Sequence, residues 1–112
     1  MNAYNKNIVI TSAVSTAIGI FRGSLKDMQA SELGSLVAKA AVKKSNLNSN
    51  EVDELIMGQV LTGATGQNPA RQAAIQAGIP IEKTAYVINQ VCGSGLRSVA
   101  AGYQTIISMI QK

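Results

Sequence analysis

Ala85-Tyr86-Val87-Ile88-Asn89-Gln90-Val91-Cys92-Gly93-Ser94-Gly95-Leu96-Arg97 joins a short apolar run to a segment with a helical pattern. The run over 85–88 contains β-branched and aromatic side chains, which favour a strand. Small residues follow the cysteine, and apolar residues then recur at the three- and four-residue spacing of a helix. The stretch therefore predicts a strand, a tight turn that holds Cys92, and a helix.

The same alternation of strand and helix extends toward the N-terminus. Apolar, β-branched runs predict two further strands, over 7–13 and 55–61. Between them, Ser31 is expected to cap a helix, and the predicted apolar face of this helix consists of Leu33, Leu36, Val37, Ala40 and Ala41. Strands that alternate with helices indicate a parallel sheet with crossover helices. The predicted fold class is α/β, with the element order β-α-β-α-β-α.

Asn68-Pro69 predicts the start of another helix, because the fixed φ of proline suits the first helical position. Gly78 and Pro80 are expected to end it. The helix after Cys92 is expected to bury one face, made of Leu96, Val99, Ala100, Tyr103, Ile107 and Ile110. That pattern continues to Lys112 without a cap, which indicates an interrupted helix.

Cys92 is the candidate catalytic residue, and it is the only cysteine of the 112 residues. Sites of α/β sheets lie just past the carboxyl ends of strands. The positive end of the following helix favours a thiolate, which is the nucleophilic form. These features favour an acyl-accepting nucleophile. The alternative is a small buried hydrophobe, the common role of a lone intracellular cysteine.

The composition indicates a globular protein, with 46% hydrophobic and 14% charged residues. No apolar run is long enough to span a bilayer, and the first residues lack the order of a secretory signal. A single cysteine cannot form an internal disulfide, so a cytoplasmic location is expected. The net charge of +4 is scattered and does not predict a nucleic-acid or membrane partner. No residue is assigned to a metal or to a bound cofactor.

Three segments resemble the thiolase family, in the order in which that family has them. Residues 89–100 resemble its acyl-enzyme cysteine segment. Residues 66–74, which read Gly66-Gln67-Asn68-Pro69-Ala70-Arg71-Gln72-Ala73-Ala74 and are followed by residues 77–80, resemble a second segment. Residues 19–25 match a third more loosely. At 13–17 the chain lacks a basic residue that the family commonly has.

The resemblance implies that the chain is part of an acyltransferase that condenses two acetyl-CoA molecules to acetoacetyl-CoA. Cys92 would be the nucleophile that forms the acyl-thioester intermediate, with its backbone N–H as a candidate oxyanion donor. Coenzyme A thioesters would be substrates, with no permanently bound cofactor. A glycine directly after the cysteine, here Gly93, resembles the acetoacetyl-forming members of the family more than the degradative long-chain members. The full-length family also implies a homo-oligomer.

In the thiolase family a histidine base and a second cysteine lie in the C-terminal half, and this chain contains no histidine. Residues 1–112 are therefore expected to form a partial thiolase-fold N-terminal domain that is inactive alone. Two alternatives remain open. The chain could be one part of a split thiolase, or a non-catalytic thiol-sensing or acyl-binding remnant.

Overall fold

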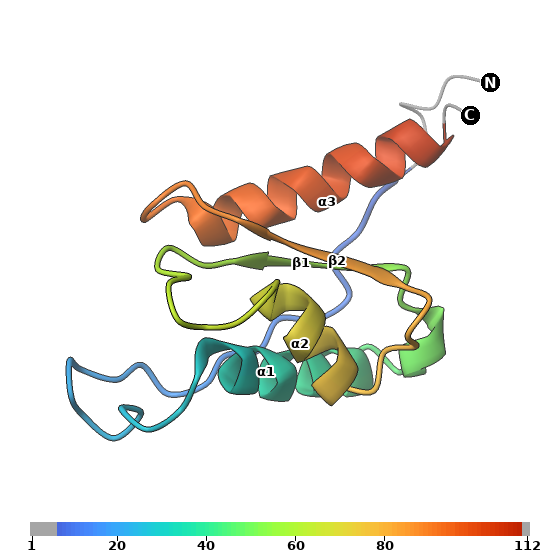
Figure 1. The fold of residues 1–112 in the computed structure, drawn as a ribbon. Helices are drawn as coiled ribbons and strands as arrows, with labels where there is room; N and C mark the ends of the chain where they lie inside the picture. Colours follow the sequence, from blue (N-terminus) through green and yellow to red (C-terminus); the bar gives the residue numbers. More distant parts are fainter. Residues whose placement is uncertain (1–6, 111–112) are drawn as a thin grey trace.

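A two-stranded parallel sheet lies between two layers of helices (Figure 1). The computed structural model describes residues 7–110. Helices α1 (Ala30–Lys44) and α2 (Pro69–Gln76) cover one face, and α3 (Ser94–Ile110) covers the other. The strands are β1 (Glu54–Gly58) and β2 (Thr84–Ile88), and a 3-10 turn, η2 (Ser49–Glu51), precedes β1. The predicted α/β class with parallel strands and a crossover helix is confirmed.

The sheet register places Ile56 beside Tyr86 and Gly58 beside Ile88. The backbone N–H of Gln59 still donates to the carbonyl of Ile88, at 3.1 Å. Beyond this bond the two strands no longer pair, and the residues after β2 form the turn that leads to α3. The strand predicted over 55–61 therefore ends at Gly58. The strand predicted over 85–88 begins one residue earlier, at Thr84.

The strand predicted over 7–13 is wrong. Residues 7–20 form neither helix nor strand, and the side chains of Val9 and Ile10 are exposed. A strand needs a neighbour that completes its ladder of hydrogen bonds, and none pairs with this segment within residues 7–110. Side chains hold it to the end of α1 instead, where the hydroxyl of Ser12 donates to the carbonyl of Ala41 at 2.8 Å.

Helix α1 begins one residue before the predicted cap. Gln29 is the N-cap, and its backbone N–H donates to the Glu32 carboxylate at 2.6 Å. Ser31 lies inside the first turn and is buried, so its predicted capping role is wrong.

The buried face of α1 also differs from the prediction. Leu36 and Ala40 are exposed, whereas Leu33, Val37 and Ala41 are half-buried. The residues turned toward α2 are smaller. Added to Gly34, a methyl group would lie 3.3 Å from the Cβ of Ala73. The two helices approach so closely that leucine side chains cannot lie between them.

Helix α2 has the predicted start and end. The side chain of Asn68 accepts the N–H of Arg71, Pro69 occupies the first helical position, and Gly78 follows the helix with a φ of +87°. The buried apolar residues of the described chain come from α2 and the turn after it, and they are Ala70, Ala73, Ala74, Ala77 and Ile79.

Two polar side chains of residues 66–74 donate hydrogen bonds to backbone carbonyls on both sides of α2. The Arg71 guanidinium donates to the carbonyls of Lys83 at 3.0 Å and Ile81 at 2.8 Å. Gln72 donates to the carbonyls of Thr65 and Gln67, both at 2.9 Å. The segment therefore orders the loops before and after α2.

Helix α3 approaches β1 most closely where the strand ends. A methyl group added to Gly58 would lie 2.6 Å from the carbonyl carbon of Ser94 and 2.8 Å from the nitrogen of Gly95. Those atoms are backbone, which cannot rotate away. The start of α3 therefore rests directly on β1.

The buried face of α3 differs in part from the prediction. Leu96, Val99 and Tyr103, expected to be buried, are exposed, while Ala100 and Ile107 are half-buried. The side chain of Ile110 lies outside the described residues. At the start of α3, Ser94 and Gly95 face the sheet, because a larger side chain would not fit at this separation.

We predict that Gly58→Ala destabilises the chain by about 2 kcal/mol or more, because the new methyl group meets backbone that cannot yield. Urea unfolding of the two proteins measures the difference. Gly63→Ala is the matched control, since a methyl group there meets no atom within 4 Å. Equal losses in the two variants would contradict the close contact.

We predict that Arg71→Lys lowers the free energy of unfolding by about 1–3 kcal/mol, because an ammonium cannot reproduce the fork that binds two carbonyls. Arg97→Lys is the control, since the exposed Arg97 side chain donates no hydrogen bond within residues 7–110. Urea unfolding again provides the measurement, and an unchanged midpoint for Arg71→Lys would refute the role.

Candidate active site

Cys92 lies in the turn between β2 and α3, two residues before the helix begins. Its thiol is free and its side chain is exposed. The predicted position, past the carboxyl end of a strand and at the start of a helix, is confirmed. Within residues 7–110 the side chain of Cys92 is exposed, which does not fit the alternative of a small buried hydrophobe.

The turn is closed by its own backbone. The N–H of Gly93 donates to the carbonyl of Gln90 at 2.9 Å, and the N–H of Ser94 donates to the carbonyl of Val91 at 3.1 Å. These bonds bring the chain round within a few residues. Cys92 lies within this turn, and its side chain is exposed.

Ser94 fastens both sides of this turn through one buried hydroxyl. Its Oγ accepts the backbone N–H of Gln90 at 2.8 Å and donates to the carbonyl of Val91 at 2.7 Å. The side chain is only 4% exposed, so water does not replace these partners readily. Ser94 therefore determines the path of the residues on either side of Cys92.

Asn89 connects the turn to the other strand. Its side-chain oxygen accepts the N–H of Val91 at 2.9 Å, and its amide nitrogen donates to the carbonyl of Val60 at 3.1 Å. Because Val60 follows β1, the turn is held against the carboxyl ends of both strands. Asn89 and Ser94 stand in the segment quoted above, but the sequence predicted Ser94 only as a small residue beside the cysteine and did not predict these hydrogen bonds.

Val91 adopts a strained backbone conformation next to the cysteine. Its φ is +49°, a region that β-branched residues rarely occupy. Such strain persists only where surrounding contacts impose it, and it concentrates at functional sites. Here the contacts are the bonds from Asn89 and Ser94 to the Val91 backbone.

A shallow hollow of about 280 Å³ adjoins the turn, lined by Gln90, Gly93, Leu96, Arg97 and Ala100. The N–H groups of Gly95 and Leu96, in the first turn of α3, have no hydrogen-bond acceptor among residues 7–110. The site thus combines an exposed thiol, nearby backbone donors and open space. An arrangement of this kind can admit a planar carbonyl group to the sulfur.

Two negative findings concern the part of the chain that the structure describes. Within residues 7–110, no three histidine, cysteine, aspartate or glutamate side chains are grouped so that they could hold a metal ion. Over the same residues, every helix is too short or too polar to cross a bilayer.

We predict that Ser94→Ala destabilises the chain by about 1–3 kcal/mol, because it leaves the N–H of Gln90 without its acceptor. Ser98→Ala is the matched control, since the Ser98 hydroxyl only donates to the carbonyl of Gly95 in its own helix. Urea unfolding measures both variants. A loss no larger in Ser94→Ala than in Ser98→Ala would contradict the role of Ser94.

Known proteins are similar to this chain in sequence and in fold. The chain is 54% identical over 102 residues to acetyl-CoA acetyltransferase of Rhizobium meliloti (strain 1021), an alignment covering 91% of this chain and 26% of that protein. It is 54% identical over 99 residues to acetyl-CoA acetyltransferase of Paracoccus denitrificans, covering 88% of this chain and 25% of that protein. The chain therefore spans about a quarter of the length of these relatives.

The crystal structure of Acat5 thiolase from Ascaris suum in complex with coenzyme A superimposes on this chain with a TM-score of 0.80. The identity is 41%, and the match covers 81% of this chain and 24% of that chain. The family model described as the N-terminal domain of thiolase matches residues 8–110. With the family model spanning nearly its whole length, the chain belongs to the thiolase family.

Proposed function

We propose that this chain is the N-terminal part of an acetyl-CoA acetyltransferase in which Cys92 carries the acetyl group. One observation carries the proposal: the chain's only cysteine is exposed on a constrained turn at the start of α3. The identity of 54% to the acetyltransferase of Rhizobium meliloti supports it. The coenzyme A bound to the Ascaris suum thiolase supports a coenzyme A thioester as substrate.

In the first half-reaction the thiolate of Cys92 attacks the carbonyl carbon of acetyl-CoA. A sulfur–carbon bond to the enzyme forms, and the bond from carbon to the sulfur of coenzyme A breaks. Coenzyme A leaves with the bonding electrons and takes up a proton. The backbone N–H of Cys92 is the proposed donor to the oxyanion that forms in between.

In the second half-reaction another acetyl-CoA loses an α-proton to a base. The resulting carbanion attacks the carbonyl carbon held on Cys92. A carbon–carbon bond forms, the thioester to the enzyme breaks, and acetoacetyl-CoA is released. Cys92 recovers its thiolate, so the reaction has no net oxidation or reduction.

This chain supplies the nucleophile but not the base. It contains no histidine and no second cysteine, and a nucleophile of this type is activated by an adjacent base. We infer that both groups come from polypeptide that this chain does not span. The chain alone is therefore proposed to be inactive in condensation.

A fusion tests this proposal. The full chain replaces the matching N-terminal part of the Rhizobium meliloti acetyltransferase, and acetoacetyl-CoA thiolysis is followed by absorbance. We expect measurable turnover by the fusion and none by the chain alone. Cys92→Ser should lower turnover of the fusion by about a thousandfold or more, because the oxygen nucleophile is far weaker.

Ser108→Ala is the control in that fusion, since Ser108 is an exposed residue near the end of α3. Its turnover should match that of the unaltered fusion. An active Cys92→Ser fusion would exclude Cys92 as the acyl carrier. Condensation by the unfused chain would contradict the proposed need for an external base.

A further inference from the structure

The turn around Cys92 uses nearly all of its own backbone N–H groups. Four of the five groups over residues 90–94 donate hydrogen bonds to acceptors in the same turn, namely those of Gln90, Val91, Gly93 and Ser94. The fifth is the N–H of Cys92, which has no acceptor within residues 7–110. Because the four bonded groups already have partners, the donor of this turn that remains for a substrate is the N–H beside the sulfur.

This N–H belongs to a peptide group whose other side is fixed by Ser94. The carbonyl oxygen of the group is that of Val91. It accepts two hydrogen bonds from Ser94, one from Oγ at 2.7 Å and one from the backbone N–H at 3.1 Å. A trans peptide group is planar, and its C=O and N–H point in opposite directions. By holding the oxygen of Val91, Ser94 therefore determines the direction of the Cys92 N–H.

The hydroxyl of Ser94 also strengthens this donor. Its Oγ accepts the N–H of Gln90 at 2.8 Å, so a lone pair faces Gln90 and the hydroxyl proton is left for the carbonyl of Val91. Hydrogen bonds linked through one polar group polarise each other. A donor on the oxygen of a peptide group draws electron density from its nitrogen, since the two atoms share the amide resonance. The N–H of Cys92 is thereby made a better donor.

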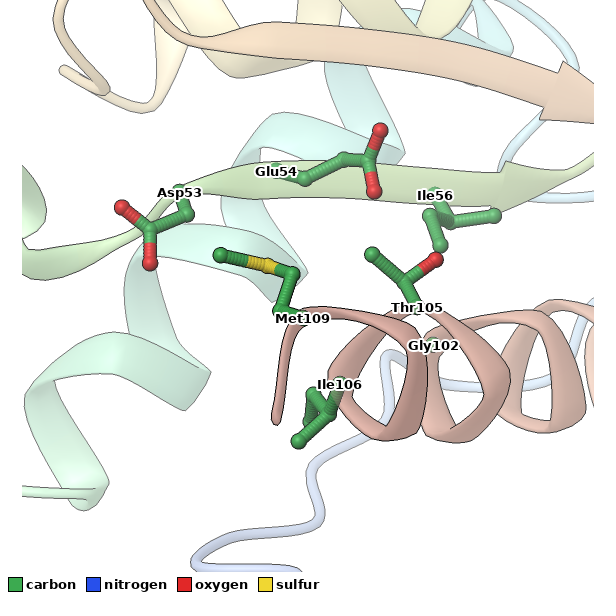
Figure 2. A pocket seen from close by; sticks show the side chains of 7 residues that line it. All are labelled: Asp53, Glu54, Ile56, Gly102, Thr105, Ile106 and Met109. Carbon is green, nitrogen blue, oxygen red and sulfur yellow. The ribbon is translucent and has the colours of Figure 1, made fainter. Parts of the chain in front are cut away.

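Ser94 stands on the part of α3 that is held most closely to the sheet. A methyl group added to Gly58 would lie 2.6 Å from the carbonyl carbon of Ser94. Toward the other end of the helix, Thr105 and Met109 point toward β1, and a hollow of about 230 Å³ lies between strand and helix (Figure 2). The end of α3 that carries Ser94 is thus the supported end, and groups that position a reacting atom need such support.

We propose that Ser94 is a positioning residue for acyl transfer, which directs the N–H of Cys92 toward the oxyanion of the reacting thioester. The inference rests on the function proposed above. When the thiolate of Cys92 adds to the carbonyl carbon, the carbonyl oxygen takes up the negative charge. The charge leaves with the sulfur of coenzyme A when the tetrahedral intermediate collapses. Because Ser94 acts on a charge that develops only after attack, it contributes to the rate of acylation and not to substrate binding.

A role of Ser94 in folding alone makes a different prediction. Loss of the hydroxyl would then displace or disorder the turn, and every reaction of the Cys92 thiol would change by a similar factor. A role toward the oxyanion affects only those reactions in which an oxyanion forms. The two roles can therefore be separated by the choice of reagent.

Two reactions of Cys92 test the proposal in the fusion with the remainder of the Rhizobium meliloti enzyme. Acetylation by acetyl-CoA passes through an oxyanion, whereas alkylation by iodoacetamide displaces iodide from a saturated carbon and forms none. Both reactions are timed by quenching and peptide mass spectrometry, in the unaltered fusion and in Ser94→Ala. Ser98→Ala is the matched control, since the Ser98 hydroxyl donates to the carbonyl of Gly95 in its own helix.

Ser94→Ala should slow acetylation by about tenfold or more, because the N–H of Cys92 is no longer held toward the oxyanion. The acetyl-CoA concentration that gives half the maximal rate should change by less than about twofold, and so should the rate of alkylation. Ser98→Ala should match the unaltered fusion in both reactions. Ser94→Gly also lacks the hydroxyl and suits the start of a helix, so it provides the same comparison if Ser94→Ala does not fold.

Equal acetylation of the unaltered fusion and the hydroxyl-free variant would overturn the role of Ser94 and leave the proposed function intact. Equal slowing of acetylation and alkylation would also overturn it, since the thiol itself would then have been displaced. An unaltered fusion that is alkylated at Cys92 but takes up no acetyl group would reject the acetyltransferase function, and the role of Ser94 with it.

Discussion

The close contact between Gly58 and the start of α3 governs the arrangement of the site. Ser94 and Gly95 lie so near to Gly58 that a single methyl group would collide with their backbone. The contact places the first turn of α3 at the carboxyl end of β1. The connection from β2 must therefore reverse within a few residues. Cys92 lies at the outside of this short connection, beside the helix terminus.

The short connection requires a backbone conformation that valine does not favour. Val91 has a positive φ, and the side chains of Asn89 and Ser94 form hydrogen bonds with the backbone of Val91. Asn89 also ties the turn to the chain that follows β1. The position of the thiol thus depends on neutral hydrogen bonds to backbone groups. In a nucleophile site, such bonds hold the reacting atom in place before substrate arrives.

Small residues form the contacts of both helical layers. Gly34 of α1 lies close to Ala73 of α2, and Ser94 and Gly95 of α3 lie close to Gly58 of β1. At these points, the close approach leaves no room for large apolar side chains between the elements. Those side chains point outward, and on α3 they form a surface that begins one turn from Cys92. The packing that positions the nucleophile therefore also leaves large apolar side chains of α3 at the surface.

The sequence by itself determined the local features. Asn68-Pro69 and Gly78 define α2 because capping and φ preferences act within a few residues, and the run before Cys92 defines β2. The tertiary structure decided the rest. Periodicity identifies an apolar stripe on α1 or α3, but it does not identify the element against which each helix packs. In this structure, smaller residues form the closest contacts of both helices. Residues 7–13 have strand-like composition, yet a strand exists only where another chain segment completes its hydrogen bonds.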